Sequence, residues 1–85
     1  MLRFLRRFFG SSAFIVELRE GKARCVKGKL LDRMLSEFSE VARQHGLAVG
    51  TVLGKRGSAG IRLRFSKEIP SASHQQFRNI WNQFS

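Results

Sequence analysis

The 85-residue chain is poor in cysteine, proline and tyrosine, and it has no apolar run of the 18 or more residues that a membrane-spanning helix needs. Its single cysteine, Cys25, excludes a disulfide within the chain and favours a reducing compartment. Only two histidines accompany this cysteine, so no zinc-ligand spacing is present, and we expect no metal or cofactor.

Acidic residues are also scarce, because six Asp and Glu oppose 16 Lys and Arg, for a formal net charge of +10. The excess is uneven along the chain. Residues 1–10 carry three arginines and no acid, residues 11–46 carry seven bases and five acids, and residues 47–85 carry six bases and one acid. The length allows one domain, so we interpret residues 1–12 as a basic amphipathic tail and residues 13–85 as one small α+β domain.

The hydrophobic pattern of the domain predicts the same order of elements twice. Alternation from Phe14 to Val26 around a turn at Glu20-Gly21 predicts a hairpin in which Val16 opposes Cys25. Apolar residues then recur at helical spacing from Leu30 to Ala42, with Gly46 as the stop.

The second half predicts two strands, residues 47–53 and 61–66, around a seven-residue loop at 54–60 that contains three glycines. A final helix begins near Pro70. We therefore predict a two-layer α+β fold, a four-stranded antiparallel sheet with both helices on one face, in the order strand-strand-helix-strand-strand-helix. The strand order within the sheet is left open.

Two segments resemble a known family of short bacterial proteins that is described only as a domain of unknown function. They are Leu63–Pro70, with its Phe-Ser-Lys-x-Ile-Pro run, and Gln75–Trp81, with its Gln-Gln-x-x-Arg-Asn run. The likeness covers about residues 14–82. It implies a bacterial origin, no known activity and, in many members, a hydrophobic N-terminal membrane segment. This chain departs from the last feature, because its N-terminus is short and contains arginines.

The tail segregates apolar and basic residues when it is placed on a helical wheel. Its Leu and Phe side chains occupy an arc of about 160° and its arginines a separate arc of about 100°. Such a helix lies on an anionic membrane surface. The predicted membrane-surface residues are Leu2, Arg3, Phe4, Leu5, Arg6, Arg7, Phe8 and Phe9. Three alternatives remain: the tail folds back onto the sheet, it is a frayed terminus, or it is an organellar targeting sequence.

Basic residues of the two hairpins predict a polyanion site on the outer sheet face and the 54–60 loop, with Lys55 and Arg56 at the loop tip. A register that opposes Leu53 with Ile61 places Gly50 opposite Arg64, so that open backbone lies beside the arginines. Five engaged cations would give a salt slope of about −4 to −5 in log–log terms. The alternative is that these charges are only solvated. The predicted nucleic-acid-binding residues are Arg24, Lys55, Arg56, Arg62 and Arg64.

Catalysis is not expected, because the candidate groups Cys25, His45, His74 and Asp32 show no motif spacing that would bring them together. Polar residues of the last helix form a second candidate surface, for a protein partner; alternatively they pair with neighbouring loops. These residues are Gln75, Gln76, Arg78 and Asn79.

The sequence therefore predicts a non-enzymatic basic module that binds a polyanion, with nucleic acid as the first choice and no small-molecule substrate. The alternative is a peripheral membrane-surface protein that is attached by its tail and binds a protein partner. For both we expect a cytoplasmic location, with association with the inner face of the membrane in the second case.

Overall fold

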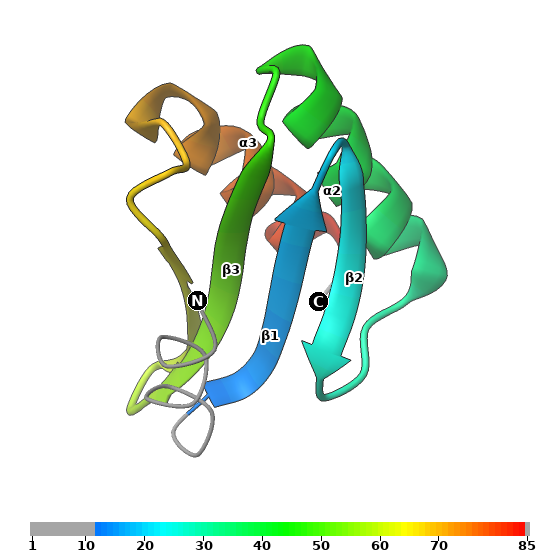
Figure 1. Cartoon of the computed structure of the whole chain (residues 1–85). Helices are drawn as coiled ribbons and strands as arrows, with labels where there is room; N and C mark the ends of the chain where they lie inside the picture. The colour runs from blue at the N-terminus through cyan, green and yellow to red at the C-terminus, as the bar shows by residue number, and fades with distance from the viewer. Residues whose placement is uncertain (1–11, 85) are drawn as a thin grey trace.

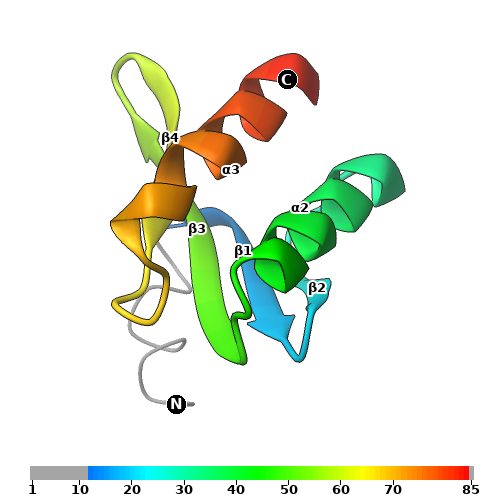
Figure 2. The same cartoon turned by 90° about the horizontal axis from the view of Figure 1, so that it is seen from above.

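The computed structural model describes residues 12–84, which form a two-layer α+β fold (Figure 1). Four antiparallel strands make one sheet in the order β2-β1-β3-β4, and both helices cover the same face of it (Figure 2). The predicted fold class and element order are confirmed. The elements are β1 (Ser12–Arg19), β2 (Lys22–Lys27), α2 (Asp32–Gln44), β3 (Val49–Gly57), β4 (Gly60–Phe65) and α3 (Ser71–Phe84).

The first hairpin has the predicted register, with Val16 opposite Cys25 and Leu18 opposite Ala23. Its turn is made by Glu20 and Gly21, both of which have positive φ, at 50° and 78°. Two consecutive residues with positive φ are what a tight two-residue hairpin loop requires, because that turn matches the right-handed twist of the strands.

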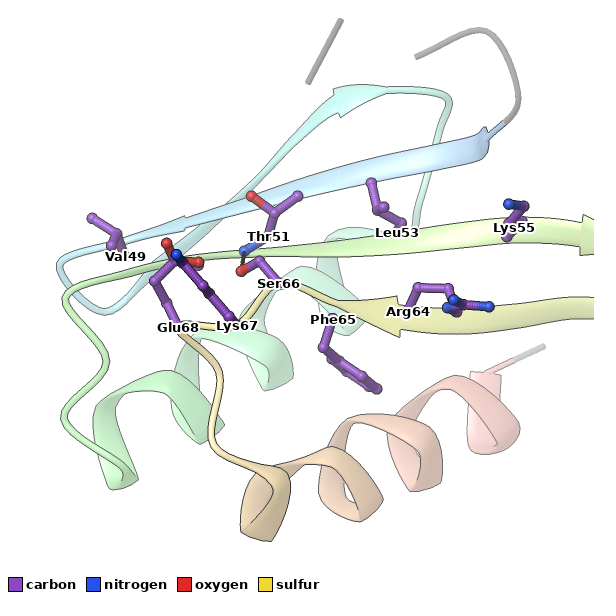
Figure 3. Close-up of a pocket in the computed structure, with 10 residues that line it drawn as sticks. Val49, Thr51, Leu53, Lys55, Arg64, Phe65, Ser66, Lys67 and Glu68 are labelled. Carbon is purple, nitrogen blue, oxygen red and sulfur yellow. Dashed lines mark hydrogen bonds between the residues drawn. The ribbon is translucent and has the colours of Figure 1, made fainter. Parts of the chain in front are cut away.

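The predicted register of the second hairpin is wrong. Pairing continues to Gly57 opposite Gly60, so the seven-residue loop does not exist and Leu53 opposes Arg64. At the other end of the pair, the Thr51 amide donates a 3.0 Å hydrogen bond to the Ser66 hydroxyl (Figure 3).

The predicted register is wrong because two glycines, Gly54 and Gly50, have other positions than predicted. Gly54 belongs to β3 because the aromatic ring of Phe14 lies directly over it, where any side chain would overlap with the ring. Gly50 opposes Leu18 rather than Arg64, and its α-carbon faces Ile69 on the helix side of the sheet. Gly50 and Gly54 therefore make room for side chains of the core rather than for a loop.

The core lies between the sheet and the two helices. Phe38 of α2 and Phe77 of α3 are both 0% exposed, and their rings meet edge to face with centroids 5.2 Å apart. Val16 and Val52 of the central strands lie beneath them and are also fully buried. Each such side chain contributes about 2–3 kcal/mol by burial, so this cluster holds the helices to the sheet.

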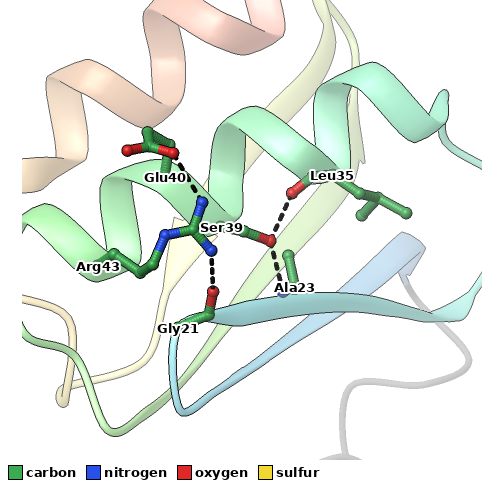
Figure 4. Close-up of polar contacts among 6 residues, drawn as sticks. All are labelled: Gly21, Ala23, Leu35, Ser39, Glu40 and Arg43. Atoms are coloured by element: carbon green, nitrogen blue, oxygen red, sulfur yellow. Dashed lines mark hydrogen bonds and ion pairs between the residues drawn. The ribbon is translucent and has the colours of Figure 1, made fainter.

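Helix α2 covers the outer edge of β2 through polar contacts (Figure 4). The Ser39 hydroxyl accepts a 2.8 Å hydrogen bond from the Ala23 amide and donates one of 2.8 Å to the Leu35 carbonyl. Arg43 donates to the Gly21 carbonyl at 2.9 Å and to the Glu40 carboxylate at 2.6 Å. These contacts occupy backbone groups at the start of β2, the Ala23 amide and the Gly21 carbonyl of the turn before it.

We expect Ser39→Ala to destabilise the fold by about 1–2 kcal/mol, because the Ala23 amide would lose its acceptor in a largely buried position. Urea denaturation followed by circular dichroism measures the change. Ser36→Ala on the exposed side of the same helix is the control, with an expected change within about 0.5 kcal/mol. Equal effects of the two substitutions would contradict the role of Ser39 at this edge.

Candidate functional site

The helix-free face of the sheet carries three exposed cations close together on β3 and β4. Lys55 opposes Arg62 in the antiparallel pair, and Arg64 opposes Leu53 one step further along. Directly opposed residues point to the same side of a sheet, with Cβ atoms about 5 Å apart. The three side chains therefore form one patch, and the alternation of Arg62 and Arg64 with buried Leu63 is as predicted.

The other two predicted nucleic-acid residues lie elsewhere. Arg24 is on the same face but in β2, at the opposite edge, where it opposes Glu17 of β1. Three strand spacings separate β2 from β4, which is roughly 14 Å. Arg56 opposes Ile61, whose side chain packs against the core, so Arg56 is on the helix side at the end of the hairpin.

A groove of about 610 Å³ runs along the helix-free face beside Lys55 and Arg64 (Figure 3). Val49, Thr51 and Leu53 line it along β3, and Thr51 and Leu53 point away from the helices. Its charged lining consists of Lys55, Arg64, Lys67 and Glu68. Lys67 was not among the residues predicted from the sequence, because it comes directly after the strand pattern of β4.

Glu68 is the acidic group of this groove. A hydrogen bond from the Ser66 hydroxyl holds the pKa of the Glu68 carboxyl below its ordinary value. The carboxylate is therefore ionised at neutral pH. It disfavours an anion at its own end of the groove and leaves the Lys55–Arg64 end as the more favourable one.

A second hollow, of about 530 Å³, lies between β4 and α3. Arg62 and Arg64 line it from the strand, and Arg78 and Trp81 line it from the helix. The guanidinium carbon of Arg78 lies 5.4 Å from the centroid of the Phe65 ring, a cation–π contact that ties this arginine to β4. Arg64 belongs to both hollows.

We call the cations around β4 the basic edge: Lys55, Arg62, Arg64, Lys67 and Arg78. Within residues 12–84, the ion pairs are Arg19–Glu17 at 4.0 Å and Arg43–Glu40 at 2.6 Å. No member of the basic edge is paired with a carboxylate of this part of the chain. Among these cations, Lys67 lies near enough to the Glu68 carboxylate to help lower its pKa.

The predicted partner-binding residues of α3 are divided between separate roles. Gln76 accepts a 2.5 Å hydrogen bond from His45 and donates one of 3.2 Å to Gln44, so it joins α3 to α2. Gln75 donates to Asn79 at 2.9 Å on the exposed side of the helix. Arg78 belongs to the basic edge instead.

The titratable groups that were considered for catalysis have separate structural partners. The Cys25 thiol donates to the Lys27 carbonyl at 3.0 Å, and burial raises the pKa of this thiol. The His74 ring is stacked on Phe65 with centroids 4.0 Å apart, and its Nε2 atom donates to the Ile69 carbonyl at 3.1 Å. His45 bonds to Gln76, so Cys25, His45 and His74 each bond to a different part of the fold.

The predicted membrane-surface segment, Leu2 to Phe9, lies outside the described residues. In the part that is described, neither helix has the length and apolar character needed to cross a membrane.

The chain was compared with known protein families, with curated proteins and with solved structures. A family model described as "Protein of unknown function (DUF3634)" matches residues 4–84. The chain belongs to this family. The match confirms the resemblance seen in the Leu63–Pro70 and Gln75–Trp81 segments. Searches of curated proteins and of solved structures found no match. For this DUF3634 member, function must therefore be argued from the site itself.

Proposed function

We propose that this DUF3634 member is a non-enzymatic binding module for single-stranded nucleic acid, which it holds by the phosphate backbone along the basic edge. The observation that carries the proposal is the patch of Lys55, Arg62 and Arg64 on the helix-free face, without ion-pair partners in the described residues. Unpaired surface cations that neutralise phosphates release condensed counterions, which is the main source of sequence-independent affinity.

The geometry favours an extended strand of phosphates. Arg62 and Arg64 are two residues apart on β4 and so repeat at about 6.7 Å along one side of the strand. Lys55 lies beside Arg62, and Lys67 lines the groove after the end of β4, next to Glu68. The cations therefore follow the strand direction, as the backbone of a bound single strand would.

The helix-free face contributes charge rather than base recognition. The aromatic residues of the strands, Phe14 and Phe65, point toward the helices, where Phe14 contacts Trp81 and Phe65 contacts Phe77. Sheets that read single-stranded RNA by sequence display aromatic side chains for stacking on their open face. We therefore expect binding across this face with little preference among nucleotide sequences.

The test is a salt series of RNA binding measured by fluorescence anisotropy. Five phosphate contacts at about −0.7 each predict a log–log slope of about −3.5 for a single strand. The double variant Arg62→Ala/Arg64→Ala should lower the affinity and make the slope shallower by about 1.4.

The matched control is Arg24→Ala/Arg56→Ala, which removes the same net charge from the far edge and from the helix side of the sheet. It should leave the slope nearly unchanged. If both double variants weaken binding equally, general charge and not the basic edge carries the affinity. Stronger binding to anionic liposomes than to RNA, lost in the Arg62/Arg64 variant, would assign the same edge to a membrane surface.

A further inference from the structure

The hollow between β4 and α3 differs in chemistry from the groove on the sheet face. Arg62, Arg64 and Arg78 are among its lining residues, the first two from the exposed edge strand and the third from α3, and none of its described lining residues is acidic. Arginine presents a planar fork of donors that matches the oxygen atoms of a phosphate group. Its volume of about 530 Å³ lies within the range of small-ligand pockets, 300–1,000 Å³.

The same hollow holds the aromatic group that the sheet face lacks. Trp81 is half-buried: its ring packs against Phe14, with centroids 5.1 Å apart, and the residue also lines the hollow. Asn82 follows it and is exposed, with an amide that both donates and accepts hydrogen bonds. The indole ring of Trp81 can stack on a nucleic-acid base, and the Asn82 amide can form hydrogen bonds with the edge of that base.

The arginine on the helix side is held in position. The Arg78 guanidinium rests over the Phe65 ring at 5.4 Å, and the other contacts of Phe65 are with His74 and Phe77. Because this support is part of the core packing of α3 against β4, Arg78 loses less conformational entropy on binding than a free surface arginine.

From these observations we infer that the hollow is a subsite for one nucleotide, with its phosphate among Arg62, Arg64 and Arg78 and its base against Trp81 and Asn82. This inference rests on the proposed function and names the part of the nucleic acid that the basic edge recognises. Arg64 lines both hollows, so a strand whose backbone follows the groove reaches the subsite without a break.

Trp81 is the single tryptophan of the chain, so its fluorescence reports directly on this subsite. We expect a dodecamer of oligouridylate, added to the full-length chain, to quench Trp81 emission over the same concentrations at which anisotropy reports binding. Uridine monophosphate at higher concentration should produce the same quenching, whereas inorganic phosphate should not.

Arg78→Gln should lower the affinity for the dodecamer about fivefold and remove most of the quenching. The matched control is Arg33→Gln, because Arg33 is also an exposed helical arginine over an aromatic ring, 5.6 Å from the centroid of Phe84. It should change neither signal.

The outcomes separate the two proposals. Binding by anisotropy with unchanged Trp81 emission, or equal effects of Arg78→Gln and Arg33→Gln, would overturn the nucleotide subsite and leave the proposed function standing. Absence of any binding to the dodecamer would overturn both.

Discussion

Replacing Gly54 with alanine is expected to destabilise the fold by about 2–3 kcal/mol. Gly54 lies in the middle of β3, opposite Leu63, and a β-carbon there would overlap with the Phe14 ring. This ring is 3% exposed and contacts Trp81, so it has little room to move. Urea denaturation measures the loss of stability, and altered Trp81 emission in the folded variant would show that the ring had been displaced.

Gly57→Ala is the control in the same strand. Its β-carbon would meet only the Gly60 carbonyl oxygen at 3.5 Å, an ordinary contact, and its φ is not positive. We expect a change within about 0.5 kcal/mol. If Gly54→Ala were as mild as Gly57→Ala, the packing of Phe14 on β3 would not be what holds this part of the hairpin in register.

The Gly54 substitution also bears on the candidate site. Gly54 lies between Leu53 and Lys55 and opposes Leu63, which lies between the two arginines of the patch. A strand displaced at this point would alter the spacing of Lys55, Arg62 and Arg64 together. We therefore expect RNA affinity to fall in the folded variant even though no charge is removed.

Phe77→Ala is expected to have the larger effect on stability, about 3–5 kcal/mol. Phe77 is 0% exposed, and its ring contacts Phe38 of α2 and Phe65 of β4. Removal of the ring would leave a cavity where both helices meet the sheet. Because a domain of this size is stable by only about 5–10 kcal/mol, thermal denaturation should show a large fall in Tm.

Phe84→Ala removes the same ring from the last turn of α3, where the side chain is only partly buried and packs at the margin of the core. Its cost should be about 1 kcal/mol, in proportion to the smaller area buried. A Phe84 variant as unstable as the Phe77 variant would indicate that the C-terminal end of α3, rather than the Phe38–Phe77 contact, anchors the helix.

The elements of the fold could be predicted from local patterns. Apolar residues at helical spacing from Leu30 to Ala42 predict a helix with one buried face. The alternation of Ile61, Leu63 and Phe65 predicts a strand with one buried face, because helices and strands have different periods. In the first hairpin the register from Val16 to Leu18 was predicted correctly, since the short Glu20-Gly21 turn leaves few alternatives, but the irregularity between Ile15 and Val16 was not predicted. The register of the second hairpin was not predicted, because its glycines also match a flexible loop.

The candidate site was predicted only in part. Alternation along β4 indicated that Arg62 and Arg64 share the exposed side, and this is correct. It could not indicate that Lys55 stands beside Arg62, that Arg56 faces the other way, or that Arg78 approaches from α3. These neighbours come from other strands and from a helix, and residue spacing within one strand carries no information about them.

The sequence by itself determined the order of the elements, the sides on which their apolar residues lie, and the strong positive charge. The tertiary structure decided the strand order, the register of the second hairpin and which cations form the basic edge. The physical reason is that a local pattern specifies which side of a strand is buried, whereas the pairing partner depends on packing between distant residues. Here the ring of Phe14 lies over Gly54 where β1 pairs with β3, and the pairing of β3 with β4 places Lys55, Arg62 and Arg64 together.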